Sequence, residues 1–106
     1  MKVSTTCSIS GFDVSETIGV VNGSIVKAKH VFRDIGAGLK TIIGGEIKGY
    51  TMLMNEARKI AYERMVKEAE SLGADGIVGF RYVSTQVMAG ASEILAYGTA
   101  VKLKKS

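Results

Sequence analysis

Apolar residues recur at steps of three and four between positions 49 and 72, which predicts one long amphipathic helix. The expected apolar stripe consists of Leu53, Ala57, Ile60, Ala61, Met65, Ala69 and Leu72. Charged residues at positions 56, 59, 63 and 67 have the spacing of favourable ion pairs on the opposite, exposed side. Gly73 follows at the position where a residue of positive φ ends a helix.

A shorter helical pattern precedes this helix, from position 29 to position 43. Gly36 and Gly38 each weaken such a helix by up to about 1 kcal/mol relative to alanine. Two glycines in one helix therefore indicate close packing against another backbone. We expect the Gly44-Gly45 pair to end this helix and to separate it from the longer one.

The N-terminal part of the chain carries a hairpin pattern. Asn22-Gly23 lies between β-branched runs at 18–21 and 25–26, and this is the strongest short signal for a tight turn between two strands. Residues 4–6 form a further short β-prone stretch. We therefore predict a two-stranded hairpin before the helices.

Two more strands are predicted after the long helix, over residues 76–83 and 94–103, with a hairpin loop at 89–92. Strict alternation would place Val78, Phe80 and Tyr82 on one face of the first of these strands. The order β-β-α-α-β-β predicts an α+β fold, in which an antiparallel sheet is covered by the long helix and accompanied by a shorter glycine-bearing helix.

Composition places the chain among folded proteins with one domain, residues 1–106. Its 106 residues are 46% hydrophobic and 23% charged, and no apolar run is long enough to span a bilayer. The N-terminus lacks the apolar run of a signal peptide. A single cysteine, Cys7, makes no internal disulfide and fits a reducing compartment. We expect a cytoplasmic protein with no membrane partner.

The charge pattern argues against a nucleic-acid partner. The net charge is only +4, and the basic residues lack a dense stripe with interleaved aromatic reading groups. They gather mainly at Lys27, Lys29, Arg33, Lys40 and Lys48, and at Lys102, Lys104 and Lys105. We expect these residues to form a solvated surface.

The sequence contains few candidate residues for catalysis or metal binding. His30 is the only histidine and Cys7 the only cysteine, and neither lies in a nucleophile motif. We therefore predict that the protein is not an enzyme. Met52 and Met54 form the one close methionine pair, but residues two positions apart do not share a helix face well. Cys7 and His30 are weak metal candidates, and an oligomer could pool such ligands across copies.

Gly36-Ala37-Gly38 has the beginning of a dinucleotide-binding fingerprint. Thr41 occupies the position of the third glycine, and the segment does not lead from a strand into a helix. Close packing explains these glycines better than a phosphate loop.

Arg33-Asp34 is a charged pair with apolar residues on both sides. It is either a solvated turn of helix or a pair that crosses a subunit boundary or lines a cleft. Tyr50 and Arg58 are eight residues apart, about two turns, and so share a helix face. They could reach the same cleft.

The chain resembles the YbjQ-like family over nearly its whole length. The matching residues are Ser4-Thr5-Thr6, Gly19-Val20-Val21, Gly23, Phe32-Arg33-Asp34, Gly44-Gly45, Tyr50, Ala57-Arg58, Ala61, Leu72-Gly73-Ala74-Asp75, Val78-Gly79 and Gly98-Thr99-Ala100-Val101. This resemblance implies a bacterial or archaeal cytoplasmic protein with a dodecin-like α+β fold. It also implies a ring-shaped homo-oligomer, with a pentamer as the expected form. The family carries a provisional heavy-metal-binding label and implies no enzymatic activity.

Together these observations favour a homo-oligomeric binding protein with a small-molecule site between subunits. The ligand or interface candidates are Arg33, Asp34, Gly44, Gly45, Tyr50 and Arg58. The alternative is a heavy-metal-binding protein whose ligands, such as Cys7 or His30, come from several subunits; an enzyme ranks last.

Overall fold

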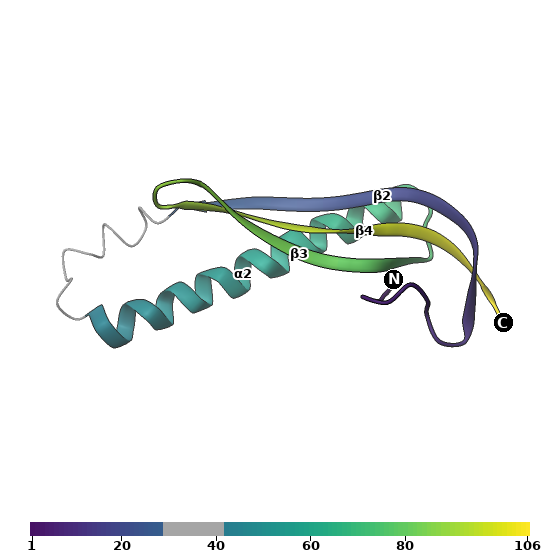
Figure 1. Ribbon diagram of the computed structural model, residues 1–106, viewed down its shortest axis with the longest axis horizontal. Coiled ribbons are helices and arrows are strands. Elements are labelled where there is room, and N and C mark those ends of the chain that lie inside the picture. The colour runs from purple at the N-terminus through teal and green to yellow at the C-terminus, as the bar shows by residue number, and fades with distance from the viewer. Residues whose placement is uncertain (29–41) are drawn as a thin grey trace.

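A computed structural model describes the backbone of residues 1–28 and 42–106, and the side chains of residues 1–27 and 51–106. The described elements are β1 (Lys2–Val3), β2 (Phe12–Ala28), α2 (Ile42–Ser71), β3 (Gly76–Met88) and β4 (Ala91–Lys105). The strands form one four-stranded sheet, and α2 covers one of its faces (Figure 1). The predicted α+β class is therefore confirmed.

The sheet is mixed, whereas the sequence predicted an antiparallel one. Its strand order is β1-β3-β4-β2, and β4 pairs antiparallel with both β2 and β3. β1 enters at the far edge and pairs parallel with β3, with Lys2 opposite Gly76. A parallel pair needs a long crossover connection, which β2 and α2 supply between these two strands.

The predicted hairpin at Asn22-Gly23 is wrong, because β2 runs unbroken through these residues for 17 positions. A Cβ atom at Gly23 would lie against the Ala61 carbonyl oxygen and the Met65 amide nitrogen, and 2.6 Å from the Cβ atom of Arg64. Glycine is therefore needed here for the close approach of α2 to β2, and not for a turn.

The predicted helix break at Gly44-Gly45 is also wrong. α2 begins at Ile42 and passes through both glycines, so it starts earlier than the predicted position 49. Glycine lowers helix stability but, unlike proline, neither removes a hydrogen-bond donor nor clashes with the preceding turn. The remainder of the predicted first helix, residues 29–41, lies outside the described residues.

The predicted end of the long helix at Gly73 is confirmed. Gly73 has φ 78°, and the Ala74 N–H donates to the Ala69 carbonyl at 3.0 Å. The Gly73 N–H donates to the Glu70 carbonyl, also at 3.0 Å. This pair of bonds is a Schellman motif, which satisfies carbonyls that the helix end would leave unpaired.

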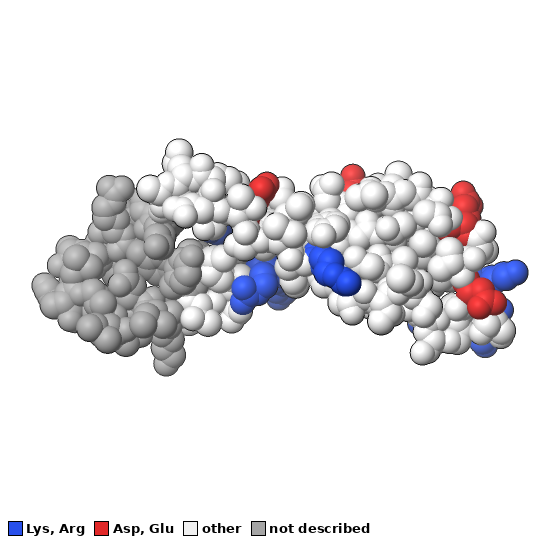
Figure 2. Space-filling view, in the orientation of Figure 1, with Lys and Arg blue, Asp and Glu red and all other residues white. Residues whose placement is uncertain are grey.

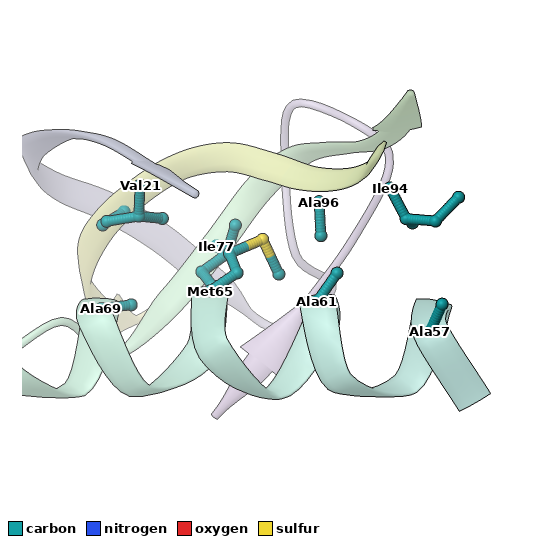
Figure 3. Close-up of a cluster of buried hydrophobic side chains, with 9 residues drawn as sticks. Val21, Ala57, Ala61, Met65, Ala69, Ile77, Ile94 and Ala96 are labelled. Carbon is teal, nitrogen blue, oxygen red and sulfur yellow. The ribbon is translucent and has the colours of Figure 1, made fainter. Parts of the chain in front are cut away.

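The core lies between α2 and the sheet and is built largely from small residues. Four fully buried residues follow one another at steps of four along α2: Ala57, Ala61, Met65 and Ala69. They face Val21, Ile77, Ile94 and Ala96 of the sheet (Figure 3). Ala100 of β4 belongs to the same buried cluster. Alanine at three of the four helix positions lets the helix lie close to the strands. The buried stripe is shorter than predicted, since Leu72, its expected last member, is 49% exposed.

A bulge at Gly79 alters the predicted faces of β3. The pairing register with β4 shifts between Val78 and Arg81, and Gly79 has φ 66°. Ile77 is buried in the core, and Phe80 packs against the same core. The two therefore face α2 together, and Val78 does not share the face of Phe80 as predicted. β3 and β4 are also longer than predicted, so that only Ala89 and Gly90 separate them.

The molecule is elongated. It measures 57 × 22 × 17 Å, and its radius of gyration is 17.5 Å. A compact domain of this length has a radius of gyration of about 13 Å. The first turns of α2 diverge from the sheet in Figure 1, which accounts for part of this length. Within the described residues, α2 contains no stretch both long and apolar enough to cross a membrane.

Candidate functional site

The predicted ligand or interface residues fall into three groups. Arg33 and Asp34 lie outside the described residues, as does His30. The first turns of α2 contain Gly44, Gly45 and Tyr50, and only the backbone is described there. Arg58 is the one candidate with a described side chain. Its surroundings form the candidate site.

Arg58 lies beside a chain of three aromatic rings between α2 and β3. The rings of Tyr62 and Phe80 meet edge to face, with centroids 5.5 Å apart and an interplanar angle of 84°. Phe80 and Tyr82 repeat this geometry at 4.8 Å and 75°. The Tyr82 hydroxyl donates to the Arg58 carbonyl at 3.4 Å, and the Arg58 guanidinium donates to the Asn55 side-chain oxygen. Such ring pairs favour a fixed arrangement.

Burial raises the pKa of the Tyr82 phenol above its ordinary value of 10.0. The nearby Tyr62 phenol raises this pKa further, whereas the Arg58 guanidinium lowers it. Tyr82 is therefore a neutral hydrogen-bond donor at physiological pH, although its side chain is partly exposed. With the guanidinium, it could contact a planar or anionic group.

The contact of these aromatic residues with Arg58 was not predicted from the sequence. Tyr62 follows Arg58 by one helical turn, and Phe80 and Tyr82 lie two residues apart on β3. Those spacings were the available signal. The Gly79 bulge turns Phe80 toward α2, and the pattern of apolar residues does not predict this bulge.

The Ser4-Thr5-Thr6 motif has a structural role next to this bulge. The Gly79 N–H donates to the Thr6 carbonyl at 2.9 Å, and the Phe80 N–H donates to the Ser4 carbonyl at 3.0 Å. The Arg81 guanidinium donates to the Thr5 carbonyl at 2.9 Å. The motif therefore covers the outer edge of β3 where the bulge leaves two N–H groups pointing outward.

Asp75, the last residue of the Leu72-Gly73-Ala74-Asp75 motif, ties the end of α2 to the sheet. Its carboxylate accepts the Leu103 N–H at 2.9 Å. Its own N–H donates to the Val101 carbonyl at 2.9 Å. These bonds set the start of β3 beside β4, so this acidic residue is explained by folding.

Metal ligands are sparse in the described part of the chain. Among these residues there is no group of three or more His, Cys, Asp or Glu side chains placed to hold a metal ion. Cys7 is exposed. Met54 packs against the core, as a gap-filling residue would, whereas Met52 is 66% exposed. A metal site on a single chain therefore has no support from these residues.

The two outer edges of the described sheet differ. On β2, the Glu68 carboxylate accepts the Asn22 N–H at 2.8 Å, and the Arg64 guanidinium donates to the Ser24 carbonyl at 2.6 Å. These backbone groups must point away from β4, since they bond to side chains instead of to the neighbouring strand. Side chains of α2 thus occupy the middle of this edge.

The direction of the Asn22 N–H also fixes the outward groups of β3. Asn22 is opposite Tyr97, so the backbone groups of Tyr97 point to β3 and its partner Arg81. Alternation along the antiparallel pair then makes Tyr82, Ser84 and Gln86 point outward. No described residue pairs with the outward groups of Ser84 and Gln86. This part of the β3 edge is open within the described structure.

Large apolar side chains are exposed near this open edge. Val83, Val87 and Met88 of β3 are 40%, 51% and 65% exposed. Most of the described surface on the face in Figure 2 is uncharged, with Lys and Arg in small groups. Uncovered apolar surface of this kind is a feature of proteins that associate.

This arrangement defines a class of protein: a small α+β domain with one long helix on a four-stranded mixed sheet. The chain belongs to the YbjQ_1 family, described as "Putative heavy-metal-binding", whose model matches residues 1–104. The family resemblance found in the sequence is therefore confirmed.

Related proteins agree with this assignment. The chain is 60% identical over 105 residues to a UPF0145 protein from Thermotoga maritima, covering 99% of each chain. It is 55% identical over 105 residues to a UPF0145 protein from Colwellia psychrerythraea, covering 99% of this chain and all of the relative. Neither the family description nor these names states an enzymatic activity.

The fold is also similar to that of a solved structure. It is a protein of unknown function of the DUF74 family from Pediococcus pentosaceus, with a TM-score of 0.60. The similarity covers 98% of both chains at 19% sequence identity. At that identity it supports the fold alone.

Proposed function

We propose that this protein is a homo-oligomeric binding protein whose small ligand lies between subunits. One observation carries the proposal: among the described residues nothing pairs with the β3 edge beyond Arg81, and apolar side chains are exposed beside it in an elongated molecule. Small domains gain core by sharing surfaces with copies of themselves. The family resemblance supports a ring, with a pentamer as the expected form, and the single free thiol fits a cytoplasmic location.

The β3 edge suits the addition of a strand. Residues 82–89 carry no charged side chain and no proline, which are the usual means of protecting an edge. Outward backbone groups at Ser84 and Gln86 are ready to pair with an extended segment of a second copy. Main-chain bonds of this kind supply affinity, and the exposed valines would gain cover.

The ligand would contact Arg58 and the neighbouring aromatic rings. This cluster offers a guanidinium, two phenol groups and ring faces, a set that fits a planar or anionic molecule. Arg33, Asp34 and Tyr50 remain candidates for the same site, and Gly44 and Gly45 for close approach of a neighbouring subunit. No enzymatic step is proposed.

Ligand-dependent stability tests this site. Thermal unfolding of the wild type is compared with Arg33→Ala, Arg58→Ala and Lys59→Ala against a panel of small aromatic carboxylates and phosphates. Lys59→Ala is the control, because it removes a positive charge from an exposed neighbour on the same helix. We expect ligand-induced stabilisation to be lost in the first two variants only. Equal stabilisation in all four proteins would contradict the site.

A second candidate function is heavy-metal binding with ligands pooled across subunits. The family description suggests it, and the exposed Cys7 thiol supplies the specific observation. A soft metal ion prefers thiolate ligands, and a symmetric assembly could supply one Cys7 thiol from each of several subunits. Metal analysis of untagged wild type and Cys7→Ser decides this. Stoichiometric metal that survives the substitution would exclude Cys7 as a required ligand.

A further inference from the structure

β2 has the features of a strand that another chain could join. It lies at the edge of the described sheet, with β4 as its strand neighbour. Residues 17–26 are uncharged, and Val20 and Val26 are 70% and 55% exposed. A long, uncharged and apolar edge is a template for strand pairing, which soluble proteins usually protect.

Two side chains of α2 obstruct this edge at consecutive outward positions. Glu68 takes the outward N–H of Asn22 at 2.8 Å, and Arg64 takes the outward carbonyl of Ser24 at 2.6 Å. An incoming antiparallel strand needs both the N–H and the carbonyl of each outward residue. Each side chain therefore removes one of the two bonds at its position.

Gly23 makes this obstruction feasible. It lies between Asn22 and Ser24 and permits contact with the backbone of α2, where any Cβ would clash. Arg64 and Glu68 are four residues apart, so they lie on one side of the helix. The helix approaches close enough for both side chains to reach past the sheet to its edge.

We infer that Arg64 and Glu68 close the β2 edge to a strand from a second copy of this chain, so that association proceeds from the β3 side. The inference rests on the proposed self-association only for that last step. The closing of β2 stands on the two hydrogen bonds and the exposed apolar strand. Without these side chains, β2 becomes a second site of strand addition and the assembly grows beyond its normal size.

The double variant Arg64→Ala/Glu68→Ala tests this inference. Its matched control is Glu63→Ala/Lys67→Ala, which also removes one charge of each sign at a spacing of four on exposed positions of α2. Light scattering coupled to size exclusion measures the mass of each. We expect the mass of Arg64→Ala/Glu68→Ala to be at least twice that of Glu63→Ala/Lys67→Ala, with an unchanged circular dichroism spectrum. Equal masses for the two variants would overturn the inference.

Two further measurements keep this test decisive. If the double variant loses its sheet signal, Glu68→Ala alone is measured, because it opens only the Asn22 position; a mass equal to that of the control would again overturn the inference. Arg64→Lys/Glu68→Gln retains a donor and an acceptor and is expected to keep the wild-type mass. A monomeric wild type would contradict the proposed function without deciding the role of these side chains, which is read from the difference between variant and control.

Discussion

The Glu68 carboxylate accepts a hydrogen bond from the backbone N–H of Asn22 at 2.8 Å, although 46 residues separate them in the chain. This bond joins the outer strand to the covering helix. It also shows that the Asn22 N–H points away from β4, and this direction fixes which backbone groups of β3 point outward. One contact therefore links the fold of the chain to its proposed association.

Replacement of Gly23 by alanine is expected to destabilise the fold by about 1 to 3 kcal/mol or more, because the added methyl group would meet the α2 backbone. Urea unfolding followed by circular dichroism measures this free energy. Asn22→Ala is the control, since the Asn22 side chain is exposed and its backbone N–H is retained. A Gly23→Ala protein as stable as the control would refute close helix packing as the reason for this glycine.

Two methionines allow a matched test of the core. Met65 is fully buried between α2 and the sheet, whereas Met52 is 66% exposed. We expect Met65→Ala to cost about 2 to 5 kcal/mol of unfolding free energy, because it leaves a cavity. Met52→Ala should change it by less than about 0.5 kcal/mol. Similar losses in the two variants would mean that the core is placed wrongly.

Gly73 and Gly23 show which parts of the fold the sequence could predict. Periodicity identified the long helix, its buried face and its end at Gly73, because those features depend on neighbours within a few residues. It failed at Asn22-Gly23, where a local turn signal competes with the approach of a helix some 40 residues later. The reason for that glycine lies in tertiary packing, which a local pattern does not contain.

The candidate site was even less accessible to sequence reasoning. Arg58 was identified through its spacing from Tyr50 and its place in the family pattern. Its contact with Tyr82 depends on the bulge at Gly79, which shifts the faces of β3 by one residue. A shift of this kind reverses which side chains meet the helix, and alternation alone could not reveal it.

Alkaline pH is expected to destabilise the fold through Tyr82. Burial raises the pKa of this phenol in the folded state, so the unfolded chain loses its proton first as the pH rises above about 10. The folded state then binds more protons than the unfolded state, and stability falls with increasing pH. The loss begins near the unfolded pKa and continues up to the raised folded pKa.

Urea midpoints at neutral and alkaline pH measure this effect. Tyr82→Phe removes the phenol and keeps the ring contact with Phe80. The midpoint of this variant should decline less between pH 9 and pH 11.5, values that lie on either side of the ordinary tyrosine pKa of about 10. An equal decline in both proteins would mean that Tyr82 does not contribute.

Proline at position 84 is expected to weaken self-association. Ser84→Pro removes an outward N–H of β3, which the chain itself does not use within the described structure. Proline is tolerated on an edge strand when its nitrogen faces outward. The mass from light scattering should fall toward that of one chain, with the sheet signal retained. Ser84→Ala keeps the N–H and should assemble like the wild type; a Ser84→Pro protein that does the same would show that this edge is not used.

Native mass spectrometry of the untagged protein tests the central claim of a homo-oligomeric binding protein most directly, because one spectrum reports both subunit number and any retained ligand. We predict a complex whose mass is a whole multiple of the 11.3 kDa chain, with five copies as the expected number, and added mass where a ligand is retained. A spectrum that contains only the 11.3 kDa monomer at every concentration tested would contradict it.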